Sequence, residues 1–292
     1  MGDIFFTTSA TSSSKVRPLT PTNEAIAGHY NSLDPYYRDI WGDHVHHGLW
    51  MSGRESTASA TEQMSLHILA SLGLSPGARL ADIGCGYGGT ARIAAERHGA
   101  DVVGLTLSEA QKRHGDTIAV ARGSVEIRVQ DWKNAAFDRG SFDALISLES
   151  LEHVADKAGF AQMARRVVRP GGRVAVATWL SAQGVSRWSQ EHLLDGISRE
   201  AMQATLVTAA EVRKTFRAAG FNLLSSEDLS PKVSRTWSVI LRRLAMRLLT
   251  RRAYWGILLN GRAEDRRFVL AAARIWLAYR TGCFRLGSFV WQ

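Results

Sequence analysis

The stretch from Arg79 to Ala91, RLADIGCGYGGTA, constrains the fold of this chain more than any other. Its first five residues alternate toward an apolar strand, and glycines then recur where a backbone takes a positive φ or approaches a ligand closely. A helix is expected to begin near Thr90. This strand, turn and helix together predict a nucleotide-binding turn in an α/β protein.

The glycine spacing alone does not separate two classes of adenosine-containing ligand. Gly84, Gly86 and Gly89 satisfy the GxGxxG pattern of nicotinamide-dependent enzymes. Those enzymes place an acid roughly 20 residues further on to hold the ribose. Here the second predicted strand, 101–106, runs into GLTLS without a carboxylate. A nucleotide oxidoreductase therefore remains only the alternative.

Two further features favour S-adenosyl-L-methionine as the cofactor, with S-adenosyl-L-homocysteine as its product. Asp82 stands two residues before the first glycine, which gives DxGxGxG, the form found where the methionine end of this cofactor lies over the turn. The third predicted strand is followed by QDW. In this motif Asp131 offers a carboxylate to an adenine amino group, and Trp132 offers its indole to the adenine face.

Strand and helix signals alternate after the glycine turn. Strands are expected at 101–106, 124–129, 142–147, 173–179 and 222–229, and helices at 57–72, 108–121, 157–168 and 208–221. This alternation predicts a Rossmann-like parallel sheet with helices on both faces and ligands outside the carboxyl ends of its strands. The closing FRLGSFVWQ alternates like a last strand, antiparallel beside the sixth, which makes seven strands. Arg169 to Gly172 is expected to be a turn, and Gly220 a helix cap.

The chain of 292 residues fits one decorated domain. Residues 1–22, rich in Ser and Thr, are expected to form a mobile arm, and 23–292 the single methyltransferase domain. Within it we expect an N-terminal helical lid, a cofactor-binding core and two substrate-side helical insertions, at 23–75, 76–180, 181–207 and 231–280. The first insertion carries Trp188 and His192, which are expected near the acceptor pocket.

The segment from Asn23 to Trp50 is dense in aromatic residues and histidines. His44, His46 and His47 lie within four positions, but no further His or Cys cluster completes a ligand set, so no metal site is predicted. One interpretation is that the aromatic residues simply pack on the core. The other is that the segment closes over the glycine turn as a lid and brings Tyr30 and His46 beside the cofactor or the acceptor.

The charge balance is basic, with 36 Lys and Arg against 27 Asp and Glu. Residues 232–252 carry seven basic residues and no acid. In a helix, Trp237, Ile240, Leu241, Leu244 and Leu248 share one face, and Arg242, Arg243 and Arg247 fall away from it. Such a helix suits peripheral contact with a membrane surface; the alternative is a solvated helix packed over the pocket. No nucleic-acid module accompanies the patch, so no nucleic-acid partner is predicted.

The cysteine count and the hydropathy indicate the cellular compartment in which the protein is expected. Cys85 and Cys283 form no disulfide or zinc pattern, which indicates a reducing environment. No apolar run reaches the roughly 18 residues of a membrane span, and the first residues lack a secretory signal. The sequence therefore predicts a soluble, cytoplasmic protein, and it carries no signal for an oligomeric state.

Several segments together resemble the gamma-tocopherol methyltransferase family of class I methyltransferases. They are IWGDHVHHGLW, DIGCGYGG, GLTLSEAQ, SLESLEHVADK and RPGGRVAVATW, between about residues 28 and 180. GLTLSEAQ is also similar to the corresponding run of cyclopropane fatty-acid synthases, which handle the ribose without the usual acid. This resemblance implies that Thr106 and Leu107 contact the cofactor and that Gln111 binds the ribose hydroxyls.

The resemblance also implies a hydrophobic small-molecule acceptor in secondary metabolism. The first choice is a prenylated phenol or another isoprenoid, methylated on carbon or oxygen. One departure is Leu151, because tocopherol enzymes tend to have glycine within SLESGEH, near the expected pocket. The alternatives are an N-methyltransferase of indole-type alkaloids, a non-catalytic S-adenosylmethionine-binding protein and a nucleic-acid methyltransferase.

The residues after the fourth strand supply the candidates for catalysis. Glu149 and His153 are four positions apart and would share a face if the turn is helical. A base is useful if the acceptor is a phenol or a carbon ortho to one, so the expected catalytic set is Glu149, His153 and His46. The plainer interpretation is that EHV only orients the turn. Glu152 matches the position where cyclopropane synthases hold a bicarbonate, for which nothing else here argues. The full expected cofactor set is Tyr30, Asp82, Gly84, Gly86, Thr106, Leu107, Gln111, Asp131, Trp132 and Leu148.

Overall fold

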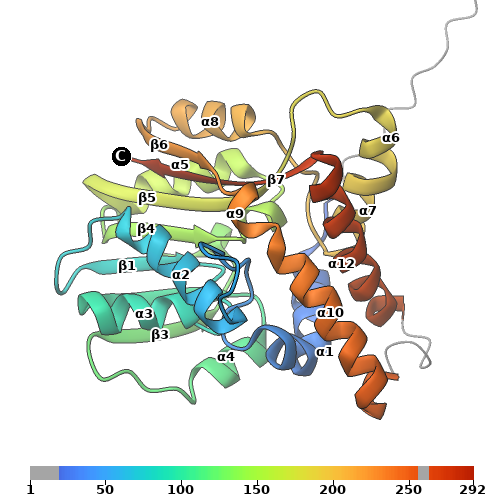
Figure 1. The fold of residues 1–292 in the computed structure, drawn as a ribbon. Coiled ribbons are helices and arrows are strands. Elements are labelled where there is room, and N and C mark those ends of the chain that lie inside the picture. Colours follow the sequence, from blue (N-terminus) through green and yellow to red (C-terminus); the bar gives the residue numbers. More distant parts are fainter. Residues whose placement is uncertain (1–19, 256–262) are drawn as a thin grey trace, which may run out of the picture.

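Seven strands form one mixed sheet in the computed structural model, which describes residues 20–255 and 263–292 (Figure 1). The strands are β1 (Arg79–Ile83), β2 (Asp101–Thr106), β3 (Ser124–Val129), β4 (Phe142–Leu148), β5 (Val168–Ser181), β6 (Leu223–Asp228) and β7 (Phe284–Trp291). Their order is β3-β2-β1-β4-β5-β7-β6, and β7 pairs antiparallel with both β5 and β6. The predicted seven-stranded sheet with an antiparallel last strand is confirmed.

The central strands are buried on both faces, as continuous apolar runs in a parallel sheet require. β5 is longer than predicted, because the expected turn at Arg169 to Gly172 is instead a bulge inside the strand. Val168 pairs with Phe142 and Arg173 with Ala144, so four residues of β5 lie opposite one residue of β4. The bulge leaves the pairing of the following residues intact.

Helices cover both faces of the sheet. One face carries α2 (Thr57–Ala70) and α3 (Gly89–His98), and the other carries α5 (Lys157–Val167) and α8 (Ala209–Ala218). α4 (Glu109–Gly115) is shorter than the predicted helix over 108–121. The chain after Gly115 contains Thr117, Ile118 and Val120, and their β-branched side chains disfavour helix. Gly220 follows α8 with a φ of 88°, which agrees with its predicted capping role.

Further helices gather beyond the carboxyl ends of the parallel strands (Figure 1). They are α1 (Asn23–Trp41), α6 (Arg187–Ser189), α7 (Asp195–Glu200), α9 (Ser230–Val233), α10 (Arg235–Thr250) and α12 (Ala263–Thr281). α1 begins where the Thr22 side chain accepts a hydrogen bond from the Ala25 amide. α10 buries Trp237, Ile240 and Leu244, so the predicted apolar face exists and packs inward. Residues 1–19 of the predicted arm lie outside the described residues.

None of the helices within 20–255 and 263–292 combines the length and the apolarity that a bilayer crossing requires.

Candidate functional site

A cavity of about 560 Å³ opens at the carboxyl ends of β1 to β4. This is the place where neighbouring connections leave the sheet in opposite directions, the usual ligand position in such folds. The cavity lining includes all ten residues of the expected cofactor set: Tyr30, Asp82, Gly84, Gly86, Thr106, Leu107, Gln111, Asp131, Trp132 and Leu148. The three expected catalytic residues, His46, Glu149 and His153, line the same cavity.

Two glycines of the turn after β1 have a positive φ but lie in different surroundings. Gly84 has a φ of 77°, and a Cβ there would lie 2.2 Å from the Cβ of Ser150, so the turn and the end of β4 are in direct contact. Gly86 has a φ of 58°, and a Cβ there would meet no atom within 4 Å. The turn is therefore packed on one side and open toward the cavity on the other.

Asp82, at the end of β1, is a buried carboxylate that lacks a partner. The residue is 2% exposed, and its Oδ2 atom has no hydrogen-bond partner among the described residues. Burial raises the pKa of Asp82 to about 7. An unpaired buried carboxylate is costly, so this position fits a ligand that brings a positive charge. S-adenosylmethionine carries two such groups, an ammonium and a sulfonium.

The remaining walls of the cavity come from the ends of β2 and β3. The Thr106 hydroxyl donates to Gln111 Oε1 at 2.6 Å, and Ser108 Oγ caps α4 by accepting from the Gln111 amide. The indole Nε1 of Trp132 is buried and has no partner in the described part of the chain. Asp131 accepts from Asn23 Nδ2 at 2.9 Å, so its carboxylate also fastens the start of α1 to the cavity. Sequence reasoning did not select Asn23.

A second, smaller cavity of about 60 Å³, here called the chamber, adjoins the first. Both cavities are lined by Tyr30, Val45, His46, Glu149 and His153. Six aromatic rings from α1, β5 and α10 line the chamber, and they are His29, Tyr30, Tyr37, Trp41, Trp179 and Trp237. Ala271 and Ile275 of α12 complete its roof. The segment from 23 to 50 thus contacts both cavities.

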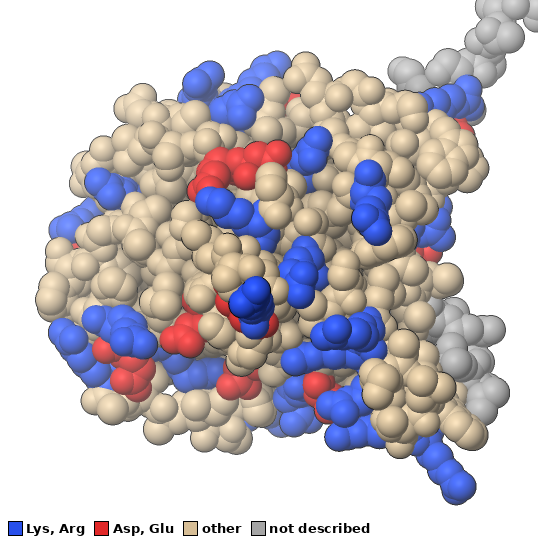
Figure 2. Space-filling view, in the orientation of Figure 1, with Lys and Arg blue, Asp and Glu red and all other residues tan. Residues whose placement is uncertain are grey.

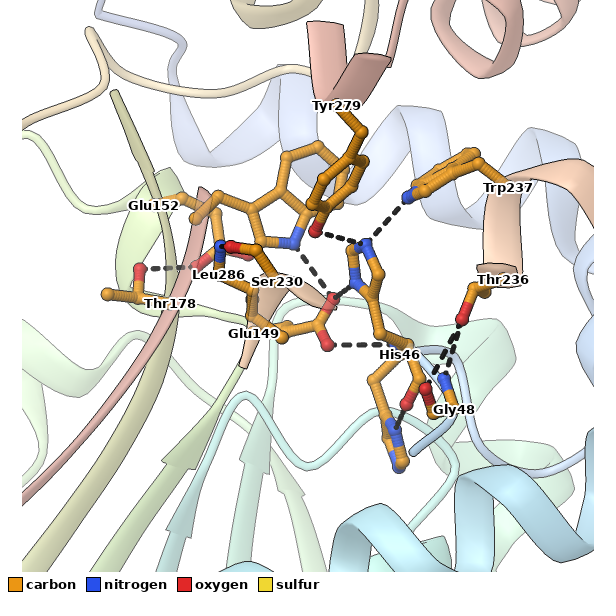
Figure 3. Close-up of polar contacts among 12 residues, drawn as sticks. His46, Gly48, Glu149, Glu152, Thr178, Ser230, Thr236, Trp237, Tyr279 and Leu286 are labelled. Carbon is orange, nitrogen blue, oxygen red and sulfur yellow. Dashed lines mark hydrogen bonds and ion pairs between the residues drawn. The ribbon is translucent and has the colours of Figure 1, made fainter. Parts of the chain in front are cut away.

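Glu149 is the centre of a hydrogen-bond network beside the chamber (Figure 3). Its Oε1 accepts from the His47 amide at 2.8 Å, and its Oε2 accepts from His47 Nδ1 at 2.7 Å and from Trp179 Nε1 at 2.8 Å. Burial raises the pKa of Glu149, but the contacts with His47 outweigh burial and hold it below the usual value. The carboxylate is thus ionised, and both of its oxygens accept hydrogen bonds from the protein.

His47 extends this network to α10 and α12, the two helices that cover the chamber and are here called the roof helices. Its Nε2 accepts from Trp237 Nε1 at 2.6 Å and contacts Tyr279 Oη at 3.0 Å (Figure 3). Trp237 lies on α10 and Tyr279 on α12, so the network ties both helices to the end of β4. The sequence predicted a functional role for the neighbouring His46, and nothing in HHG separates His46 from His47.

Glu149 and His153 do not share a helical face, because the turn after β4 does not meet the condition of being an α-helix from Glu149 onward. Glu149 has a φ of 54° and precedes a short 3₁₀ helix, Leu151–His153, so the turn is not an α-helix that starts at Glu149. A positive φ in a non-glycine residue is uncommon and strained, and strained residues cluster at functional sites. The two side chains consequently bond to different partners.

His153 pairs with Tyr30 where the two cavities meet. Its Nδ1 donates to the Met202 carbonyl at 2.7 Å, which leaves Nε2 to accept from Tyr30 Oη at 3.0 Å. Burial, with a smaller contribution from the charge of Lys157, lowers the pKa of His153, so the imidazole is neutral. Burial also raises the pKa of Tyr30 well above its usual value. The pair is therefore a neutral hydrogen-bonded unit that is able to accept a proton.

His46 is engaged on both ring nitrogens. Nδ1 donates to the His47 carbonyl at 2.9 Å, and Nε2 lies 3.2 Å from Ser65 Oγ on α2. Although His46 lines both cavities, one ring nitrogen bonds to the neighbouring His47 carbonyl and the other faces Ser65 on α2. These bonds favour a structural role for His46 in the wall between the two cavities.

One other expectation about the acceptor side needs correction. Trp188 and His192 stack on each other with ring centroids 5.2 Å apart, and neither lines either cavity. Trp188 is 55% exposed, and α6 has no buried residue. Leu151 stands between Ser150, which lines the larger cavity, and Glu152, which lines the chamber, while its own side chain is fully buried in the core between the sheet and α5.

Comparisons with known proteins agree with this arrangement. Residues 18–253 match the family model described as mycolic acid cyclopropane synthetase. The chain is 28% identical to tocopherol O-methyltransferase from Arabidopsis thaliana over 262 residues, which cover 82% of the chain and 73% of that enzyme. It is 34% identical to 2-methyl-6-phytyl-1,4-hydroquinone methyltransferase from Synechocystis over 167 residues, which cover 54% of the chain and 52% of that enzyme.

The fold is also found among solved structures. The cyclopropane synthase MmaA2 from Mycobacterium tuberculosis superposes with a TM-score of 0.81, at 23% identity, over 94% of this chain and 99% of that one. The two proteins therefore share a fold over nearly the whole of this chain.

Proposed function

The chain belongs to the mycolic acid cyclopropane synthetase family and is an S-adenosylmethionine-dependent methyltransferase, and we propose that its acceptor is a neutral, hydrophobic phenol, such as a prenylated phenol. The observation that carries this proposal is the aromatic chamber beside the cofactor cavity, with the Tyr30–His153 pair between them. The names of the tocopherol and hydroquinone relatives point to the same class of acceptor.

The larger cavity is the proposed cofactor site. Asp82 would hold a positively charged group of the methionine end, Gln111 the ribose hydroxyls and Trp132 the adenine face. When bound, S-adenosylmethionine supplies the sulfonium methyl group for an in-line displacement. The chain positions donor and acceptor and excludes water, because α1 and the residues up to 50 cover both cavities.

The charges around the chamber favour a neutral acceptor over an isoprenoid diphosphate. Burial and the negative charge of Glu149 raise the pKa of Glu152 to about 8, so this second carboxyl is protonated at neutral pH. Glu149 remains ionised. None of the described residues that line the chamber is Lys or Arg, and the nearby Arg274 is paired with Glu200 at 2.9 Å. A buried diphosphate would therefore lack compensating charge.

The Tyr30–His153 pair is the proposed proton acceptor. The acceptor hydroxyl passes its proton to Tyr30 Oη, and Tyr30 passes its own proton to His153 Nε2. His153 becomes an imidazolium as the methyl group is transferred. The Met202 carbonyl keeps the proton on Nδ1 and so keeps Nε2 free to accept. Glu149, whose two oxygens are already hydrogen-bonded to His47 and Trp179, is proposed to position His47 and, through it, α10 and α12.

A panel of acceptors tests this function. The purified protein is incubated with deuteromethyl S-adenosylmethionine and with γ-tocopherol, 2-methyl-6-phytyl-1,4-hydroquinone, geranyl diphosphate or tryptamine, and products are analysed by mass spectrometry. We expect a deuteromethyl product from a phenol and none from the diphosphate.

Two other outcomes would contradict the proposal. Transfer to tryptamine alone would indicate the N-methyltransferase, which the aromatic walls and the ionised Glu149 favour as the second candidate because both attract cations. Cofactor binding without transfer to any compound would indicate a non-catalytic binding protein.

We also propose that the end of α10 contacts an anionic membrane surface. Met246, Leu249 and Trp255 are 54%, 79% and 49% exposed there. Figure 2 shows Lys and Arg side chains gathered around the corner of the molecule where α10 ends in Figure 1. Part of the predicted basic face is used internally, because Arg247 and Arg251 are paired with Asp39 on α1. Arg242 and Arg252 stay exposed and suit lipid phosphates.

Vesicle sedimentation measures this contact. Leu249→Asp is expected to lower partitioning onto phosphatidylglycerol vesicles about tenfold, because burial of a leucine contributes roughly 1.5–3 kcal/mol. Leu224→Asp is the matched control, because Leu224 is also exposed, at 47%, but lies on β6. Equal losses in both variants, or no wild-type binding, would contradict the proposed contact.

A further inference from the structure

The segment from 202 to 204 contributes one residue to the chamber lining, and the residues at its two ends are hydrogen-bonded to the turn after β4. The Met202 carbonyl accepts from His153 Nδ1, and the Ala204 amide donates to the Glu152 carbonyl at 3.0 Å. Met202 has a φ of 51°, one of two positive values among the described non-glycine residues, and the other belongs to Glu149. A strained backbone persists only where its surroundings hold it. The position of the residue between these two anchors is therefore closely determined.

That residue is Gln203, which has an unused polar group. It is 2% exposed and lines the chamber, and its amide Oε1 has no hydrogen-bond partner among the described residues. Its backbone amide is satisfied by the Ser198 carbonyl at 2.8 Å, so the local fold does not need the side-chain amide. A buried amide oxygen without a partner destabilises a protein, so Oε1 of Gln203 is available to a ligand in the chamber.

We propose that Gln203 binds a hydroxyl group of the acceptor through Oε1 and thereby orients the phenol ring for methylation. The inference rests on the proposed function and specifies its acceptor further. An amide oxygen accepts a hydrogen bond from a neutral hydroxyl without any charge transfer. A second hydroxyl on the ring, as in a hydroquinone, then satisfies Gln203 while the first one meets the Tyr30–His153 pair.

The test compares two glutamine variants with the same local defect. Gln63, on α2, also has a buried Oε1 without a described partner, but it lines neither cavity. Binding of trimethylhydroquinone to the protein saturated with S-adenosylhomocysteine is measured by calorimetry for wild type, Gln203→Leu and Gln63→Leu. Loss of one hydrogen bond from a buried group lowers affinity about tenfold to a hundredfold. We expect that loss in Gln203→Leu alone, with unchanged affinity for S-adenosylhomocysteine.

A second probe separates hydroxyl recognition from a change of shape. The dimethyl ether of trimethylhydroquinone cannot donate a hydrogen bond, so wild type and Gln203→Leu are expected to bind it equally weakly. Thermal melts check the fold, and leucine should not lower the melting temperature because it removes an unpaired amide. Gln203→Asn, which keeps a shorter amide, should retain part of the affinity.

The outcomes distinguish this inference from the proposed function. Equal affinity of wild type and Gln203→Leu for trimethylhydroquinone would overturn it, and so would a wild type that does not bind the probe. If the affinity difference is found but no phenol is methylated in the acceptor panel, the hydroxyl site stands and the proposed reaction fails.

Discussion

Replacement of Asp82 by asparagine is expected to lower the affinity for S-adenosylhomocysteine by about 10- to 150-fold. The reason is that a hydrogen bond to a charged group contributes roughly 1.5–3 kcal/mol, and the unpaired Oδ2 of Asp82 is the buried negative charge at the glycine turn. Isothermal titration calorimetry measures the change. The matched control is Asp143→Asn on β4, whose carboxylate pairs with Arg169 away from the cofactor cavity.

The same variant gives a test of pH dependence. The pKa of Asp82 lies near 7 because the side chain is buried, and only the ionised form attracts the cofactor's ammonium group. Affinity in the wild type should therefore fall about tenfold per pH unit below 7, whereas Asp82→Asn should show a flat, weak profile. A wild-type profile that is flat between about pH 5 and 7 would contradict this role.

The raised pKa of Asp82 also predicts how the free energy of unfolding changes with pH. The pKa of Asp82 in the folded protein is raised above the ordinary value of 3.8, so the unfolded chain loses this proton at a lower pH. The ligand-free protein should lose stability as pH rises from 3.8 toward 7, and Asp82→Asn should lack that part of the loss. Urea unfolding at several pH values measures the difference.

Replacement of His153 by glutamine is expected to reduce kcat by about 10²- to 10⁴-fold, the usual contribution of a general base. Cofactor affinity should change only a few-fold, because the imidazole bonds to Tyr30 and to the Met202 carbonyl. Tyr30→Phe should lose a similar factor, and the double variant little more, because the two side chains act as one unit. Single-turnover rates with a phenolic acceptor provide the measurement.

The pH profile checks the same assignment. Burial holds the pKa of His153 below its usual 6.5, so the neutral base persists at pH values below that. The acid limb of kcat should therefore lie below pH 6.5 in the wild type and be lost in His153→Gln. Additive losses in the double variant, or a kcat within threefold of wild type, would assign the pair a structural role only.

The cofactor cavity was predictable from the sequence because its parts are local. Each of its motifs follows the end of a strand, and parallel strands bring their carboxyl ends to one edge. Asp82, Gln111 and Trp132 could therefore be placed together without knowledge of any long-range contact. The motif that ends β4 was placed correctly as well, but its backbone was not, because the positive φ of Glu149 has no signature in the sequence.

The chamber was less predictable because it is assembled from distant segments. His47 meets Trp237 and Tyr279, which lie 190 and 232 positions away. The position of Gln203 depends on a strained neighbour and on two backbone contacts with the turn after β4. Trp188 and His192 were expected there because aromatic residues in an insertion suggest a pocket, yet the insertion turns them outward. Composition identified the insertion, and only tertiary contacts decide which of its side chains face inward.

The place of β7 sets the order in which the molecule is assembled. β6 ends at Asp228 and, among the described strands, pairs only with β7, which begins at Phe284, so the ribosome adds α9, α10 and α12 before β6 can pair. Strands β1 to β5 are complete by Ser181 and can associate during translation. Strands β1 to β5, of which β1 to β4 end at the larger cavity, can therefore pair early. Strands β6 and β7 can pair only after α9, α10 and α12 have been synthesised. During synthesis, the last strand therefore pairs with the sheet only once α10 and α12, which cover the chamber, are available to pack.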